Sequence, residues 1–368
     1  MMRTPLYEEH LRLGAKMTEF AGWEMPLYYS GIGREVSAVR SAVGVFDLSH
    51  MGELIVSGPE ALEFVQFVTT NDASRLEIGQ AQYTLMCDES GGIVDDLVVY
   101  RLEADTYMLV VNAVNARSDF LWIQQYNQPG ADCRDASDDT ALVAVQGPAS
   151  RDLLGPLAGF DLDELHRFRV RRGRVGDIDT WIARTGYTGE DGFELYCSPS
   201  DCGTLWWLVL EQGQAFGVEP AGLGARDVLR LEAGYPLYGQ ELTRTTTPVD
   251  ARLLWVVKFA KGDFLGKKAI QQAERRRPKR LLVGVEAIER CVPRHGYDIA
   301  VNGVHVGYVT SGTFSPTLGK AIAMGYVERR YAEQGAGVEV EIRGKPCACR
   351  VVRTPFYRAG EAVRVPPK

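Results

Sequence analysis

The alternation of apolar and polar residues along the chain predicts both helices and strands. Val36, Val39 and Val43 recur at the spacing of a helix face and predict a helix over 33–43 that ends at Gly44. The other predicted helices span 59–68, 115–125 and 205–212, together with a short one that begins after an N-cap at Thr4 and ends at Gly14. β-rich runs predict strands over 53–56, 141–145 and 254–259, and the segment 80–86 leads into the strand that carries the acid pair.

The most unusual stretch is Gly91–Tyr100, in which two adjacent aspartates, Asp95 and Asp96, interrupt a run of aliphatic residues. Aspartate forms strands poorly, and a charged side chain is rarely buried unless it has a partner or a function. At least one of the two carboxylates is therefore expected to face a cavity or a ligand. A solvated acid pair at a strand end explains this stretch equally well.

A hairpin is predicted from two β-rich runs, 97–102 and 107–112. Its register decides which side chains share a face, because a shift of one residue turns every side chain over. With a loop over 104–106, Val98 opposes Asn112, and Asp96 lies diagonal to Asn112 on the same face. We predict this register, in which Tyr100 joins that face and Asp95 turns away. A four-residue loop separates these side chains instead.

From Leu281 onward, short strands alternate with turns that are rich in Gly, Asn and Pro. Hairpin turns are predicted at 301–304 and 343–346. The last third of the chain is therefore expected to form a small all-β domain. Within it, the hydroxyl-rich segment 310–319 is too long for a simple turn and predicts a polar loop.

Length, charge and cysteine content narrow the class of protein. A chain of 368 residues predicts two or three domains, and a net charge of −7 argues against a general nucleic-acid binder. No apolar run approaches the roughly 18 residues that a membrane span needs. The N-terminus has no signal or transit character, so we expect a cytoplasmic protein without a membrane partner. Seven cysteines without C-x-x-C spacing predict reduced thiols.

Two glycine-rich segments bring further charged residues into view. Gly222 and Gly224 are spaced as in a dinucleotide-binding motif, but Asp227 occupies the third glycine position and no βαβ unit surrounds it. Arg226 lies in the first turn of a predicted helix, where a cation opposes the helix dipole, so an anionic partner is expected. The three glycines of 186–192 allow a rigid turn that leads to Glu194 at the start of a strand.

The chain resembles the T-protein family of the glycine cleavage system, the tetrahydrofolate-dependent aminomethyltransferases. Seven stretches carry the resemblance in the family's order: TPLY at 4–7, DLSHM at 47–51, GGIVDDL at 91–97, GYTGE at 186–190, GLGARD at 222–227, SGTFSPTLG at 311–319 and PFY at 355–357. Any one of these motifs is weak evidence, but seven in order make a chance resemblance implausible.

This resemblance implies an α+β fold of three domains, arranged like a cloverleaf around a central folate cavity. The first domain is expected to be discontinuous, over 1–50 and 138–250. The second, over 51–137, carries the acid-pair hairpin. An all-β, barrel-like C-terminal domain is expected over 280–362, and a connecting strand and helix over 251–279.

The resemblance also implies a reaction. The aminomethyl group held on the lipoyl arm of H protein passes to tetrahydrofolate, with release of ammonia; N5 of the folate attacks first, and N10 then closes the ring. Asp96 matches the family's general base at N10, and an ordinary aspartate is ionised at neutral pH. Glu194 matches the residue that accepts two adjacent N–H donors of the pterin.

The remaining matched residues are expected to line or close the folate cavity. Arg226 suits the anionic glutamate tail of folate. The others are Met51, Tyr83, Tyr100, Asn112, Tyr187, Trp255 and Arg358. The run DARLLW at 250–255 differs from the small, glycine-containing run of the family.

Two other folate-binding functions remain as alternatives. A stand-alone demethylase of N- or S-methyl compounds shares the fold and the folate pocket. A non-catalytic folate-binding relative used in iron–sulfur maintenance has a cysteine beside its Gly-Gln-Glu motif. Here the residues before Gly239 are Pro236, Leu237 and Tyr238, which argues against that relative.

Overall fold

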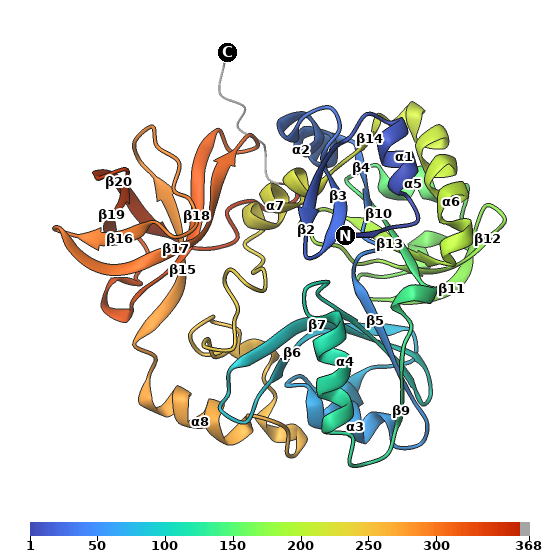
Figure 1. Ribbon diagram of the computed structural model, residues 1–368, viewed down its shortest axis with the longest axis horizontal. Helices are drawn as coiled ribbons and strands as arrows, with labels where there is room; N and C mark the ends of the chain where they lie inside the picture. The colour runs from blue at the N-terminus through green and yellow to red at the C-terminus, as the bar shows by residue number, and fades with distance from the viewer. Residues whose placement is uncertain (361–368) are drawn as a thin grey trace.

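The computed structural model describes residues 1–360, which form three lobes around a common centre (Figure 1). The chain combines helices with four sheets, one of which closes into a barrel. The expected α+β class with a barrel-like C-terminal domain is therefore confirmed. The last two residues of the range expected for that domain, 361 and 362, lie outside the described residues.

The first lobe contains two sheets. The smaller has the strand order β1-β3-β2, and the larger has the order β11-β12-β13-β10-β4-β14. Its strands are β1 (Met2–Arg3), β2 (Lys16–Phe20), β3 (Trp23–Tyr28), β4 (Val43–Asp47), β10 (Ala141–Gln146), β11 (Val170–Val175), β12 (Ile178–Ala183), β13 (Gly192–Cys197) and β14 (Val218–Pro220). Its helices are α1 (Tyr7–Arg12), α2 (Ile32–Ser41), α5 (Ser150–Leu154), α6 (Pro199–Gly213) and α7 (Leu223–Glu232). Because β4 pairs with β10, segments about 100 residues apart in sequence share one sheet.

The second lobe is a five-stranded sheet with the order β6-β7-β8-β5-β9. Its elements are β5 (Gly52–Ser57), α3 (Ala61–Val68), β6 (Gln80–Cys87), β7 (Ile93–Glu103), β8 (Thr106–Val111), α4 (Ala116–Gln125) and β9 (Asp132–Asp135). Leu54, Val56, Leu97 and Val99 point from one face of the sheet into a core that also contains Phe64 of α3. The opposite face packs toward the first lobe, because Tyr100 and Val110 share a core with Phe46 and Ala144.

The third lobe is the closed barrel, with the order β15-β18-β17-β16-β19-β20. Its strands are β15 (Arg280–Ala287), β16 (Asp298–Val301), β17 (Val304–Ser315), β18 (Lys320–Glu328), β19 (Gly337–Ile342) and β20 (Lys345–Val352), and α8 (Lys267–Arg276) precedes them. The predicted hairpin turns are confirmed, since Val301 pairs with Val304 and Ile342 with Lys345. The segment 310–319 is not a loop: β17 continues to Ser315 and only the residues after it turn.

Three further local predictions were wrong. Helix α2 ends at Ser41, and Gly44 lies inside β4, where a Cβ atom would sit 2.2 Å from Cγ2 of Val39. Thr4 does not cap α1, since its hydroxyl donates to Asp47 Oδ2 at 2.6 Å. The segment 254–259 contains 3₁₀ turns rather than a strand. In each case a tertiary contact or a close approach overrides the local pattern.

The prediction that all cysteines are reduced was also wrong. Cys291 and Cys347 form a disulfide in the barrel, whereas the other five cysteines are free thiols. Among residues 1–360, no helix is long and apolar enough to cross a membrane.

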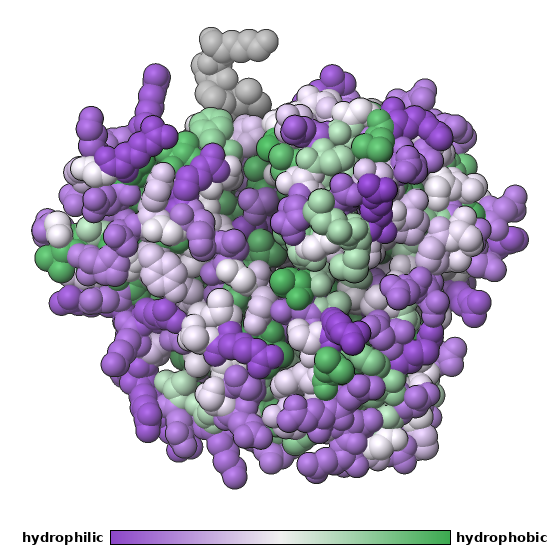
Figure 2. All heavy atoms as spheres, viewed as in Figure 1, coloured by the Kyte–Doolittle hydropathy of each residue, from purple (hydrophilic) through white to green (hydrophobic). Residues whose placement is uncertain are grey.

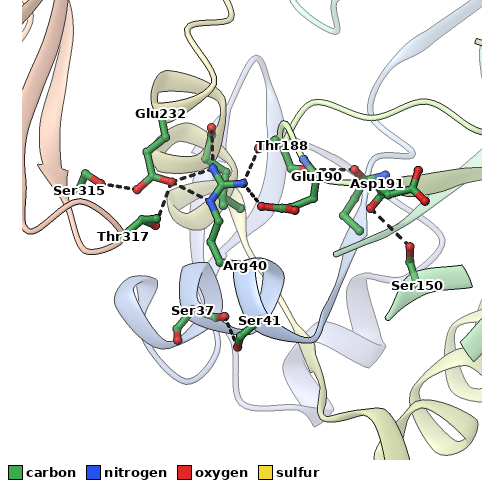
Figure 3. Close-up of polar contacts among 12 residues, drawn as sticks. Ser37, Arg40, Ser41, Ser150, Thr188, Glu190, Asp191, Glu232, Ser315 and Thr317 are labelled. Carbon is green, nitrogen blue, oxygen red and sulfur yellow. Dashed lines mark hydrogen bonds and ion pairs between the residues drawn. The ribbon is translucent and has the colours of Figure 1, made fainter. Parts of the chain in front are cut away.

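A buried ion network joins the first lobe to the barrel (Figure 3). Arg40 on α2 donates to Glu232 on α7 at 2.7 Å and to Glu190 at 2.8 Å. Glu232 also accepts hydrogen bonds from the barrel residues Ser315 and Thr317. The network therefore fixes α7 between the two lobes, which is where Figure 1 shows this helix.

Candidate functional site

The strand that carries the acid pair, β7, is an inner strand of the five-stranded sheet in the second lobe. It pairs with β6 on one side and with β8 on the other. The turn that leads into it depends on Gly92, because a Cβ atom at this position would lie 2.1 Å from the carbonyl oxygen of Arg244. This close approach places the segment 244–246 over the start of β7, where Ile93 N donates to Thr246 O at 3.0 Å.

The predicted hairpin register was wrong by two residues. Val98 pairs with Val110 rather than with Asn112. Glu103 pairs with Thr106, which leaves a two-residue loop, and a register shift lies between Arg101 and Glu103. The shorter loop and the shift each move the register by one residue, so the two errors add to an even number. Every side chain consequently keeps its predicted face.

Asp96 and Asn112 meet, as the face assignment requires. Asn112 Nδ2 donates to Asp96 Oδ1 at 3.0 Å, and the Tyr83 hydroxyl donates to Asp96 Oδ2 at 2.9 Å. Burial, followed by the negative charge of Asp95, raises the pKa of Asp96 to about 7. A carboxyl group with this pKa is suited to accept a proton near neutral pH.

Asp95 turns to the other face of the sheet, where it lies beneath α4 and is fully buried. Its carboxylate accepts from Asn112 N at 2.9 Å, Asn112 Nδ2 at 2.8 Å and Asn115 Nδ2 at 2.9 Å. A solvated acid pair is therefore contradicted. Asn112 bonds to both aspartates and so links the two faces of the strand.

Glu194 lies on β13 of the first lobe, across from the second lobe. The hydroxyl of Thr185 and that of Tyr100, at 3.3 Å, both donate to its Oε2. Tyr196 in turn donates to the Tyr100 hydroxyl at 3.2 Å. The hydrogen bonds hold the carboxylate at the junction between the two lobes.

Tyr187 and Arg226 form a third group. The Arg226 guanidinium lies 4.7 Å from the centre of the Tyr187 ring, which stacks on Tyr235 with 5.6 Å between ring centres. Within residues 1–360, the Arg226 guanidinium makes no hydrogen bond or ion pair with a protein group, and burial lowers its pKa. Glu194 is near enough to oppose this shift. A half-buried cation without a carboxylate partner is suited to bind an anionic ligand.

The last three predicted residues lie around this centre in different ways. Trp255 stacks on Tyr83 with 5.9 Å between ring centres and is 61% exposed. Met51 packs against the core that joins the first and second lobes. Arg358 is exposed, and it follows Tyr357, whose ring lies under the Arg40 guanidinium. Of the ten predicted residues, Arg358 alone has no described side-chain contact that links it to the others.

Sequence reasoning missed the side chains that support these groups. Thr185 and Tyr196 hold Glu194 and Tyr100, while Asn115 holds Asp95. Thr185 borders the glycine-rich motif at 186–192, which was the only local signal for it. Tyr196 and Asn115 act through contacts between distant segments, and the sequence pattern carries no sign of those contacts.

Together the side chains offer a base, a hydrogen-bonding carboxylate and a cation around one centre. Asp96 and Glu194 belong to different lobes, and the charge of Asp96 acts on Tyr187, which lies against Arg226. In Figure 2, several hydrophobic residues are visible among polar ones near the middle of the view, where the lobes meet. The arrangement fits a ligand that has a flat, hydrogen-bonding ring system and a separate anionic group.

Comparisons with known proteins cover nearly the whole chain. The model of the GCVT N-terminal domain matches residues 6–261, and that of the glycine cleavage T-protein C-terminal barrel domain matches residues 280–358. The aminomethyltransferase of Geobacillus thermodenitrificans is 48% identical over 98% of this chain and 100% of the relative. The aminomethyltransferase of Symbiobacterium thermophilum is 49% identical over 98% of each protein. The crystal structure of the glycine cleavage system aminomethyltransferase T from Bartonella henselae superposes with a TM-score of 0.92, at 38% identity over 97% of this chain and 98% of that one.

Proposed function

The chain belongs to the glycine cleavage T-protein family and is an aminomethyltransferase, and from this premise we propose how its own residues carry out the transfer. The co-substrate is tetrahydrofolate, whose N5 and N10 take up the one-carbon unit. The donor is the aminomethyl group on the lipoyl arm of H protein, and ammonia is released. We further propose the domain limits 1–50 with 138–250, 51–137 and 280–362, with 251–279 as the connection.

We propose that Asp96 is the general base. Its pKa of about 7 lets the carboxylate accept the proton that leaves N10 when the ring closes, and pass it on to the departing amine, which leaves as ammonia. Tyr83 and Asn112 each donate to one of its oxygens, at 2.9 and 3.0 Å, and so fix its orientation. This pair of hydrogen bonds is the observation that carries the assignment.

Glu194 and Arg226 are proposed to bind the two ends of the folate. Glu194 Oε2 is already held by Tyr100 and Thr185, so the carboxylate is preorganised to accept from the paired N–H donors of the pterin. Among residues 1–360 no carboxylate pairs with the Arg226 guanidinium, and this cation is proposed to bind the glutamate tail. Tyr187 stacks between Tyr235 and the guanidinium and closes this end of the site.

The edge of the site is proposed to receive the lipoyl arm. Trp255 is exposed and stacks on Tyr83, the residue that orients Asp96. Trp255, Met51 and Arg358 are proposed as contacts of the folate. We propose two partners, the lipoylated H protein and tetrahydrofolate, and expect neither a nucleic acid nor a membrane as a partner.

An ammonia-release assay with aminomethylated H protein and tetrahydrofolate tests this function directly. We expect turnover that requires both components. No release with this donor, together with folate-dependent turnover of an N- or S-methyl compound, would identify a demethylase instead. Folate binding without either turnover would identify a non-catalytic folate-binding protein.

A further inference from the structure

A second carboxyl pair lies directly behind Asp96. Asp119, on the first turns of α4, is fully buried, as is Asp95 on β7. Asn115 connects the two residues, because its side chain donates to Asp95 Oδ1 at 2.9 Å and its backbone oxygen accepts from Asp119 N at 2.7 Å. The two carboxyl groups are close enough for each to act on the pKa of the other. Two ionised carboxylates this close together, away from water, would repel each other strongly, so one proton must lie between them.

The hydrogen-bond donors around the two groups are unequally distributed. Asp95 accepts three N–H donors, two from Asn112 and one from Asn115. Neither oxygen of Asp119 receives a donor from residues 1–360. Donors stabilise an ionised carboxylate, and their absence in a buried site favours the neutral acid. The negative charge therefore belongs on Asp95 and the proton on Asp119.

The other charged and titratable groups near Asp119 come from β7 and from the 238–244 segment. The negative charge of Asp96 raises the pKa of Asp119, and the positive charge of Arg244 lowers it. Burial, together with the charges of Asp95 and Asp119, raises the pKa of Tyr238, and Arg244 opposes this shift. Burial is the largest effect on Asp119, and with the charge of Asp95 it raises the pKa of Asp119 despite Arg244.

We propose that Asp119 is protonated in the folded protein and donates its proton to Asp95, so that the two buried groups together carry a single negative charge. This inference rests on the proposed role of Asp96, for which Asp119 is a positioning residue. The charge on Asp95 keeps Asp96 a strong enough base, and a second charge on Asp119 would hold Asp96 protonated. Asn112 then has one fixed acceptor on each side of the strand, Asp95 Oδ1 and Asp96 Oδ1.

The proton is tested by ¹³C NMR of the aspartate carboxyl carbons in the folded protein, without substrates, between pH 5 and 9. We expect one carboxyl carbon to keep the shift of a protonated acid across this range in the wild type and in Asp96→Asn, and to be missing in Asp119→Asn. Ionisation of every aspartate above pH 8 in the wild type would overturn the proposal. So would persistence of the protonated signal in Asp119→Asn.

Turnover provides an independent readout. Asparagine supplies the same neutral donor as a protonated aspartate, whereas leucine supplies none. We expect Asp119→Leu to lose about 10-fold or more in kcat, the usual effect of a lost hydrogen bond to a charged group, and Asp119→Asn to rescue most of it with an unchanged acid limb of the pH–rate profile. If Asp119 were ionised, Asp119→Asn would remove a repelling charge and move that limb to lower pH.

These experiments separate this proposal from the proposed function. The carboxyl titration needs neither H protein nor folate, so it can fail or succeed whether or not Asp96 is the base. If Asp119→Leu does not fold, the wild-type titration and Asp119→Asn still decide the question.

Discussion

At Asp96, the same burial that favours catalysis opposes folding. The carboxyl group must be ionised to accept a proton, yet its pKa of about 7 means that ionisation at neutral pH costs free energy in the folded state. An active-site carboxyl group of this kind trades stability for reactivity.

Asp96→Asn separates these two effects. Turnover is expected to fall by on the order of 10² to 10⁴, the usual contribution of a positioned acid–base group, while folate binds within a few fold. The measurement is ammonia released per enzyme with saturating H protein, alongside calorimetry of folate binding. Full activity in this variant would remove Asp96 from the mechanism.

The pH dependence of stability follows from the raised pKa. The folded-state pKa of Asp96 lies above the unfolded value of 3.8, so the folded protein binds a proton at Asp96 more tightly than the unfolded chain does. The stabilisation from this proton is fully present below about pH 4 and is lost as the pH rises through about 7. Asp96→Asn cannot ionise, and it should therefore melt higher than the wild type at pH 8 and close to it at pH 4. Thermal unfolding at the two pH values checks the sign.

Glu194→Ala should weaken folate binding without disturbing the fold. Charge-assisted hydrogen bonds contribute roughly 1.5 to 3 kcal/mol, so the Kd should rise about 10- to 150-fold. Calorimetry with tetrahydrofolate measures the change. Glu211→Ala, on the exposed face of α6, serves as the matched control, and equal effects of the two variants would place Glu194 outside the site.

At the scale of elements, the position of α7 depends on one buried arginine. Arg40 on α2 bonds to Glu232 on α7 and to Glu190 and Thr188 in the β12–β13 connection (Figure 3). Glu232 bonds onward to the barrel. Because α7 also carries Arg226, the network that joins the lobes sets the distance between this cation and the acid-pair strand.

Arg40→Ala leaves Glu232 buried without its charge partner, and it should destabilise the protein by about 3 to 5 kcal/mol. Arg34→Ala on the same helix removes an ion pair with Glu219 in which the arginine is 68% exposed, and should cost at most about 1 kcal/mol. Urea unfolding of both variants tests the contrast. Similar losses would mean that the network contributes little beyond a surface ion pair.

At the scale of the molecule, the site draws on more than one lobe, so bound folate should stabilise the whole protein. At a concentration of 100 times Kd, a ligand that binds the folded state alone adds about 2.7 kcal/mol. Glu194→Ala with a 100-fold higher Kd should gain only about 0.4 kcal/mol at the same concentration. Thermal melts with and without tetrahydrofolate compare the two, and an equal gain would contradict a role for Glu194 in binding.

The sequence alone determined the acid pair, most of the elements and the face on which each hairpin residue lies. These depend on local preferences and on the two-residue period of a strand. Because the error in the hairpin register was two residues, an even number, each side chain stayed on its predicted face. The turn glycines and the barrel hairpins are likewise local, because a few residues fix their backbone.

Only the tertiary structure decided how the site is supported. Thr185 beside Glu194, Asn115 beside Asp95 and Asp119 near Asp95 all join segments that the sequence separates. Burial by those segments also raises the pKa of Asp96, whereas the residue type alone predicts an ordinary value. The physical reason is that desolvation and charge pairing depend on what packs around a group, and a linear pattern of residues does not specify its neighbours in space.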